Sequence, residues 1–153
     1  MIAENIMVTN IVTARVDEAV DHALARMRDA RLRMIPVVGD DAEIVGVIST
    51  FSVLEKVVPS YIVTGDLNHI PYAPDIGILR RHYDEISTLS IAAIMDKNPL
   101  TVQRDESLLS VAAAMVSYTK HEYAMVVDDQ KRLLGIISAG DVLDRMKRDD
   151  DDA

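Results

Sequence analysis

The 153-residue sequence contains no cysteine, which excludes disulfides, thiolate zinc sites and cysteine nucleophiles. Long apolar runs are missing too, since no stretch approaches the roughly 18 apolar residues that a membrane span requires. The first ten residues, MIAENIMVTN, lack the basic segment and the hydrophobic stretch of a secretory signal. These absences predict a cytoplasmic protein with no membrane partner.

Basic residues are outnumbered, with 16 lysines and arginines against 25 acidic residues and a net charge of -9. This surplus of negative charge disfavours nucleic acid as a main partner. Four of the acids form an acidic tail at residues 149–153, which we interpret as a solvated terminus. Apolar residues make up 49% of the chain and charged residues 27%, a balance typical of a folded globular protein.

Catalytic signatures are also missing. The sequence has no Walker A loop, no G-x-S-x-G elbow and no dinucleotide fingerprint. Its four histidines share no metal-ligand spacing. An enzyme acting on a nucleotide or phosphoester would need a carboxylate cluster that binds metal and faces a cleft, and the sequence indicates none. We therefore expect no enzymatic activity, no metal site and no required cofactor.

The sequence does contain an internal repeat. The segment IMVTNIVTARVDEAVDHALARM, which begins at Ile6, aligns with IMDKNPLTVQRDESLLSVAAAM, which begins at Ile94. After one extra residue in the second copy, GVISTFSVL from Gly46 aligns with GIISAGDVL from Gly135. Because the alignment keeps the same order over most of the chain, we infer two copies of one unit.

Each copy has the same predicted order of elements, β-α-β-β-α. The first long helix has apolar residues at the i, i+3, i+4 and i+7 positions of a buried stripe, and Asp17 is its predicted cap. The stripe comprises Val20, Ala23, Leu24 and Met27 in the first copy and Leu108, Val111, Ala112 and Met115 in the second. The two strands and short helix that follow are predicted at 34–38, 44–48 and 51–58, and at 123–127, 133–137 and 139–146.

One unit has too little core to be stable alone, so the two copies are expected to pack with approximate twofold symmetry in an α+β fold. We assign residues 1–58 to the first repeat and 92–148 to the second. Residues 59–91 form a linker with a short helix predicted near 78–86. A connection of this length in a compact protein is usually functional.

The paired units resemble the CBS domain family, named after cystathionine β-synthase, whose repeats end in G-h-h-[ST]-x-x-[DN], where h is hydrophobic. The second copy matches through NPLTV at 98–102, YAMVVDD at 123–129 and GIISAGD at 135–141. The first copy matches through MIPVVGDD at 34–41 and GVISTFS at 46–52, although Ser52 stands where an aspartate is expected.

This resemblance implies a regulatory sensor module that binds an adenosyl nucleotide, namely AMP, ADP, ATP or S-adenosylmethionine, in clefts between the repeats. It also implies a homodimer. Because no catalytic or DNA-binding domain is attached, we expect the module to act on an effector protein in trans. The alternative is a ligand-free structural or interaction dimer, which the serine at position 52 favours.

The residues of the second copy support a nucleotide site at Ser138 and Asp141. They stand where a strand passes into a helix, and backbone N–H groups and the helix dipole favour phosphate there. The Asp141 carboxylate can accept hydrogen bonds from both hydroxyls of a ribose. The pair also fits a capping box, and the two roles can coexist. The predicted ligand-binding set is Ser138, Ala139, Asp141, Thr13, Arg33, Met34 and His121.

A second, weaker site is predicted at the equivalent position of the first copy. Serine makes only a single weaker contact with a diol, so the two clefts should not be equivalent. Adenine needs an apolar slot and a few main-chain hydrogen bonds. The resemblance implies that the segment before the long helix and the turn into the strand after it supply them, with Pro99, Leu100, Thr101 and Tyr123 as candidates in the second copy. The predicted residues of this site are Ser49, Thr50, Ser52, Leu100 and Thr101.

Overall fold

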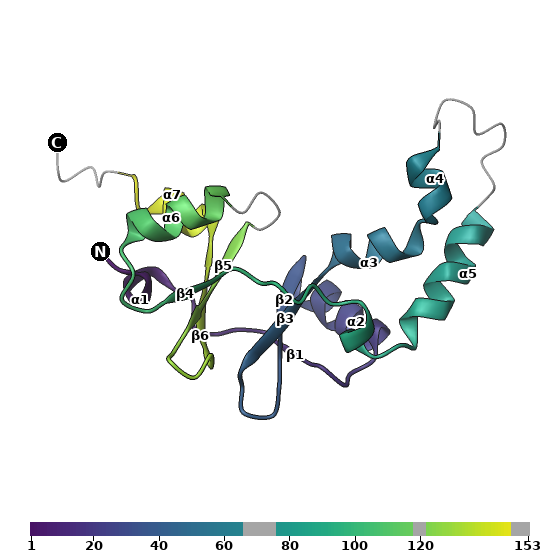
Figure 1. Ribbon diagram of the computed structural model, residues 1–153, viewed down its shortest axis with the longest axis horizontal. Helices are drawn as coiled ribbons and strands as arrows, with labels where there is room; N and C mark the ends of the chain where they lie inside the picture. Colours follow the sequence, from purple (N-terminus) through teal and green to yellow (C-terminus); the bar gives the residue numbers. More distant parts are fainter. Residues whose placement is uncertain (66–75, 118–121, 148–153) are drawn as a thin grey trace.

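Each repeat contains a small three-stranded sheet flanked by helices. The computed structural model describes residues 1–65, 76–117 and 122–147, and Figure 1 shows the two sheets side by side near the centre of the molecule. The strands of the first repeat are β1 (Ala14–Arg15), β2 (Met34–Val38) and β3 (Ile44–Ser49). β1 runs parallel to β2, and β2 runs antiparallel to β3.

The second repeat contains the same sheet. Its strands are β4 (Thr101–Gln103), β5 (Tyr123–Val127) and β6 (Leu133–Ser138). They pair in the same order and with the same directions, and both hairpins share a register shift at the last residue of the middle strand. The predicted α+β fold of two β-α-β-β-α units is therefore confirmed.

The buried stripes predicted for the two long helices are largely found. Val20, Ala23 and Met27 of the first stripe are buried, as are Leu108, Val111 and Met115 of the second. The helix of the linker is longer than the predicted 78–86, and a further short helix follows Pro59. The helices are α1 (Ala3–Ile6), α2 (Val20–Ala30), α3 (Thr50–Val57), α4 (Ser60–Thr64), α5 (Ile76–Ser87), α6 (Leu108–Ser117) and α7 (Ala139–Asp144), with a 3₁₀ turn at Ile91–Ala93.

The predicted cap of α2 is wrong. Asp17 does not cap the helix, which begins after Ala19 and has no side-chain cap hydrogen bond. The N–H of Val20 donates instead to the backbone carbonyl of Leu89, at 3.0 Å. A helix start can be satisfied by any well-placed acceptor, and here the acceptor comes from a segment that lies far away in the sequence.

Each of the two segments that lead into a repeat packs on the other repeat. The first lead-in segment, Met1–Val8, contains α1 and packs on the second repeat, whereas the second lead-in segment, Leu89–Asp96, packs on the first. Each adds apolar side chains to the core that it crosses, Ala3 and Ile6 in one case and Ile91 and Ile94 in the other. Each core is therefore completed by residues that precede the other repeat.

Backbone pairing follows the same exchange. Val8 forms an antiparallel bridge with Ile136 of β6, and Asp96 forms the equivalent bridge with Val47 of β3. The first N–H of α6 donates to the carbonyl of Met1, at 3.0 Å. The lead-in segments are thus joined to the opposite repeat by hydrogen bonds as well as by apolar contacts.

Gly46 in β3 and Gly135 in β6 lie where the lead-in segments cross the sheets. A Cβ atom at Gly46 would lie 2.7 Å from the carbonyl oxygen of Asp96, and one at Gly135 would lie 2.6 Å from the sulfur of Met7. Neither glycine has a positive φ. Each is therefore required by the close approach of the crossing segment, not by its own backbone conformation.

A third apolar cluster joins the two repeats. It lies between the β2–β3 hairpin and the β5–β6 hairpin, so it holds the two sheets face to face. The hairpin turns are also joined by backbone hydrogen bonds, from Ile44 to Lys131 at 2.9 Å and from Leu133 to Ala42 at 3.0 Å. The buried members of the cluster are Ile44, Val47, Met125 and Val127.

An ion pair between Glu18 and Arg26 joins the segment before α2 to that helix. The Arg26 guanidinium donates to both carboxylate oxygens of Glu18, at 2.7 and 3.2 Å, and to the carbonyl of Thr13, at 2.8 Å. Burial by itself would raise the pKa of Glu18, but the hydrogen bonds from Arg26 and from the Arg15 N–H outweigh it and hold that pKa below its ordinary value.

The replacement Gly46→Ala should lower the free energy of unfolding by about 1–3 kcal/mol, because the new methyl group meets a backbone oxygen that cannot rotate away. Gly140→Ala is the matched control, since a Cβ there would lie 3.5 Å from its nearest neighbour, the Ser138 hydroxyl. Urea denaturation of both variants measures the difference. Equal stability of the two would contradict the crossing role of Gly46.

The Glu18 carboxylate should stabilise the fold in a pH-dependent manner. Its pKa is lowered on folding, so its contribution is fully present above the ordinary glutamate pKa of about 4.3 and is lost as pH falls through the folded-state pKa. The wild type should be more stable than Glu18→Gln at pH 7, and the gap should close in acid. Urea denaturation of the wild type and of Glu18→Gln at several pH values measures this difference in stability. Glu85→Gln, on the exposed surface of α5, is the control.

Candidate functional site

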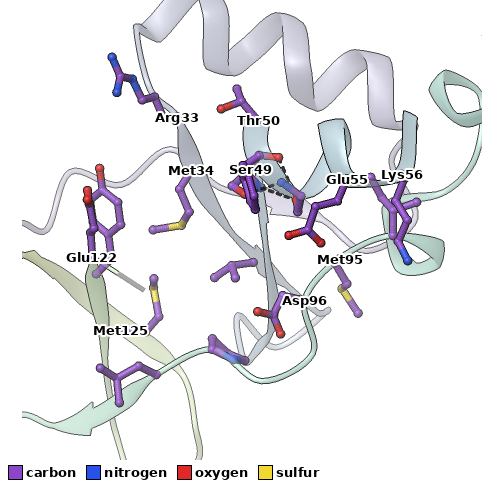
Figure 2. Close-up of a pocket in the computed structure, with 17 residues that line it drawn as sticks. Arg33, Met34, Ser49, Thr50, Glu55, Lys56, Met95, Asp96, Glu122 and Met125 are labelled. Atoms are coloured by element: carbon purple, nitrogen blue, oxygen red, sulfur yellow. Dashed lines mark hydrogen bonds between the residues drawn. The ribbon is translucent and has the colours of Figure 1, made fainter. Parts of the chain in front are cut away.

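A cleft of about 800 Å³ lies between the two repeats. One wall comes from β2, β3 and α3 of the first repeat, and the other from the second lead-in segment and β5 of the second repeat. Figure 2 shows the side chains of Met34 and Met125, one from each wall, directed toward the space between them. The volume falls in the range of small-molecule pockets.

The deep part of the cleft is apolar. Val47 and Met125 belong to the cluster that joins the repeats, and Met34 packs against that cluster from β2. Leu100, which is buried, adds a branched side chain from the segment that enters β4. A flat, uncharged ring such as a nucleobase can be held between surfaces of this kind.

Hydroxyl groups occupy the mouth of the cleft at the start of α3. Ser49 Oγ accepts a hydrogen bond from the Ser52 N–H, and Ser52 Oγ accepts one from the Ser49 N–H, both at 2.9 Å. Ser52 Oγ also donates to the Ser49 carbonyl, at 2.9 Å. This reciprocal capping box fixes both side chains, and it uses the single proton of the Ser52 hydroxyl.

The second repeat has the same capping box at the start of α7. Ser138 Oγ accepts from the Asp141 N–H at 3.0 Å, and one carboxylate oxygen of Asp141 accepts from the Ser138 N–H at 2.8 Å. Both side chains are half-buried. Because a carboxylate has two oxygens, capping by one of them leaves acceptor capacity on the other.

The helix starts offer a phosphate fewer N–H donors than the sequence suggests. The N–H of Thr50 donates to the carbonyl of Arg33, and the N–H of Ala139 donates to the carbonyl of Glu122, both at 2.9 Å. The capping boxes use a further N–H in each helix. A phosphate at either start would therefore depend mainly on side chains.

The rim of the cleft carries charges of both signs. Lys56 and Arg33 supply positive charge, whereas Glu55 and Glu122 supply negative charge. Asp96 also lines the cleft, and one of its carboxylate oxygens accepts a hydrogen bond from the Asn98 N–H at 2.9 Å. Lys56 lies in the last turn of α3, where it lines the cleft.

Most residues predicted for the weaker site come together in this cleft. Ser49, Thr50, Ser52 and Leu100 all line it, whereas Thr101 is exposed and is not among the lining residues. Tyr123, a candidate for the adenine slot, also lines it. The ligand contacts of these residues remain a prediction.

The structure does not bring together all the ligand-binding residues predicted with Ser138. Arg33 and Met34 line the Ser49 cleft, because β2 pairs with β3 in a register that places Met34 opposite Ser49. Thr13 is half-buried, and its carbonyl accepts the hydrogen bond from Arg26. His121 lies outside the described residues, as does the acidic tail.

Sequence reasoning missed several residues of the cleft. The second lead-in segment contributes Ile94, Met95 and Asp96, because it crosses the first repeat. Glu55 and Lys56 enter from the second turn of α3, and a helical spacing of three and four from Ser52 could have indicated them. The lead-in residues gave no such local signal.

No group of three or more potential metal ligands from His, Cys, Asp and Glu is present in residues 1–65, 76–117 and 122–147. Within those same ranges, no helix has both the length and the apolar character needed to cross a membrane.

Known proteins with the same arrangement have CBS domains. The chain is 28% identical over 141 residues to the chloroplastic CBS domain-containing protein CBSX2 of Arabidopsis thaliana, covering 88% of this chain and 58% of the relative. The chain thus spans little more than half the length of that relative. A structure of CBSX2 in complex with AMP has a TM-score of 0.71 and 22% identity, with 95% of both chains covered.

Two further structures share the fold. A CBS domain-containing protein of Bacillus anthracis has a TM-score of 0.76 and 14% identity, covering 95% of this chain and 92% of its own. The CBS domain pair of protein MJ0100, in complex with 5′-methylthioadenosine and S-adenosyl-L-methionine, has a TM-score of 0.68 and 19% identity, with 95% of each chain covered. The sequence pattern of the CBS domain itself matches residues 3–59 and 91–148. The chain therefore belongs to the CBS domain family and contains two copies of the CBS domain.

Proposed function

We propose that this chain is a regulatory module, not an enzyme, and that it binds an adenosyl ligand such as AMP or S-adenosylmethionine between its repeats. The observation that carries the proposal is the cleft of about 800 Å³, with its apolar interior and its polar rim. The relatives CBSX2 and MJ0100, which bind AMP and S-adenosyl-L-methionine respectively, support the ligand class.

The two ends of the cleft suit different parts of such a ligand. The adenine would lie between Met34 and Leu100, in the apolar interior. The sugar would face the hydroxyl groups at the start of α3, and a phosphate would face Lys56 at the rim. Asp141 would accept the sugar hydroxyls in a second cleft on the other side, through the oxygen that its capping box does not use.

Ligand binding could be transmitted through the second lead-in segment. This segment lines the cleft with Ile94 and Met95 and is continuous with α5, which also contacts α2 and α3. A ligand that binds one arrangement of the two walls more tightly shifts the population toward it, typically by 1–3 kcal/mol of coupling. We infer that an effector protein in the cytoplasm reads this shift in trans.

The alternative role is a ligand-free interaction module. Apolar side chains are strongly exposed on α6 and α7, which contact each other on the outside of the second repeat (Figure 1). Leu109 is 81% exposed and Val116 79%; Leu143 of α7 and Met146, which follows that helix, are each more than half exposed. We propose that this face forms a homodimer, which is compatible with either role.

A thermal-shift panel tests the ligand proposal. Selective binding to the folded state must raise the melting temperature, so at least one of AMP, ADP, ATP and S-adenosylmethionine should do so, and NADH serves as a bulky comparison. Asp141→Ala should reduce the ligand-induced shift by removing the carboxylate proposed to accept the sugar hydroxyls in the second cleft. Lys56→Glu should reduce the shift caused by AMP more than that caused by adenosine, because it acts on the phosphate.

Lys97→Glu is the control for Lys56→Glu, since Lys97 is exposed and does not line the cleft. It should leave all shifts unchanged. If none of the adenosyl ligands stabilises the wild type, the ligand proposal fails and the interaction module remains.

The dimer face is tested by Leu109→Glu, which places a charge at the most exposed of these apolar side chains. The variant should be monomeric under conditions in which the wild type is dimeric, because a buried unpaired charge costs several kcal/mol. Light scattering after size exclusion measures the mass. Glu85→Gln on α5 is the control, and a wild type that is monomeric at all concentrations would rule out the dimer.

A further inference from the structure

We propose that Glu55 is the carboxylate that recognises the ribose hydroxyls in the Ser49 cleft, in place of the acid that position 52 lacks. The inference rests on the proposed function, since it assumes an adenosyl ligand. It goes further because it identifies the acceptor group in this cleft and makes the cleft selective for ribose over deoxyribose.

Ser52 is poorly suited to bind a sugar diol. Its hydroxyl has one proton, which it donates to the Ser49 carbonyl, and it also accepts the hydrogen bond from the Ser49 N–H. Breaking either bond to bind a ligand would weaken the start of α3. A diol has two donors, and a carboxylate is the side chain that can accept from both at once.

Glu55 is placed to supply that carboxylate. It lies one helical turn after Ser52, and residues three apart on a helix share a face. Its side chain lines the cleft, and Figure 2 shows the carboxylate directed into the cleft on the side between Ser49 and Asp96. No hydrogen bond or ion pair within the described part of the chain occupies this carboxylate, so its acceptors are available to a ligand.

The second repeat has the opposite arrangement of acids. There Asp141 stands at the position equivalent to Ser52, and Asp144 stands at the position equivalent to Glu55. Asp144 is exposed and lies 3.5 Å from the Lys147 ammonium. Of these two helix positions, one in each repeat thus carries an acid available to a sugar, at the helix start in the second repeat and a turn later in the first.

The test compares AMP with 2′-deoxy-AMP in a titration followed by NMR of ¹³C-labelled methionine methyl groups. Met34, Met95 and Met125 line this cleft, so their signals report its occupancy separately from the second cleft. The wild type should bind AMP about tenfold more tightly than 2′-deoxy-AMP, since hydrogen bonds to charged groups are worth that much or more. Glu55→Gln should weaken the binding of AMP and remove most of the preference for AMP over 2′-deoxy-AMP.

Two further variants make the result specific. Ser52→Asp combined with Glu55→Gln should restore the preference for ribose, because it recreates the acid at the helix start. Asp144→Asn is the matched control in the second repeat and should change nothing in the methyl signals of this cleft.

The outcomes separate the two proposals. If AMP shifts none of the three methyl groups in the wild type, the proposed function fails for this cleft. If AMP binds there but Glu55→Gln keeps the full preference for ribose, only the role of Glu55 is overturned. An equal loss of affinity for both nucleotides in Glu55→Gln would overturn it as well.

Discussion

The close approach of a lead-in segment to the sheet at Gly46 and Gly135 is the contact on which the rest of the structure depends. At each glycine a lead-in segment crosses the sheet of the opposite copy and completes its core. The chain then continues from the crossing at Asp96 to Pro99 and Leu100, which line the cleft. The crossing therefore completes a core and places one wall of the cleft, so fold and site have a common origin.

The local features of this fold could be predicted because local patterns determine them. The apolar stripe of α2, the strands on either side of each hairpin turn and the capping box at Ser138 all depend on residues within a few positions of one another. The repeat itself was visible because two copies of such patterns recur in order. The family then followed from the residues, and the fold agrees with it.

Features that depend on distant contacts could not be predicted in the same way. The cap of α2 comes from Leu89, about seventy positions away in the chain, so the nearby Asp17 was a misleading signal. Alignment of Ile6 with Ile94 showed that they are equivalent, but it could not show which core each one fills. The same applies to the cleft, where strand register, not sequence order, brings Met34 beside Ser49.

The exchange of the lead-in segments also has a consequence for folding during synthesis. The first repeat lacks Ile91 and Ile94 until the ribosome has passed well beyond its last strand, and Met1–Val8 must wait for β6 near the end of the chain. Contacts of such long sequence separation form slowly, because the intervening chain must first be ordered. The core of neither repeat is therefore complete until most of the chain has been synthesised.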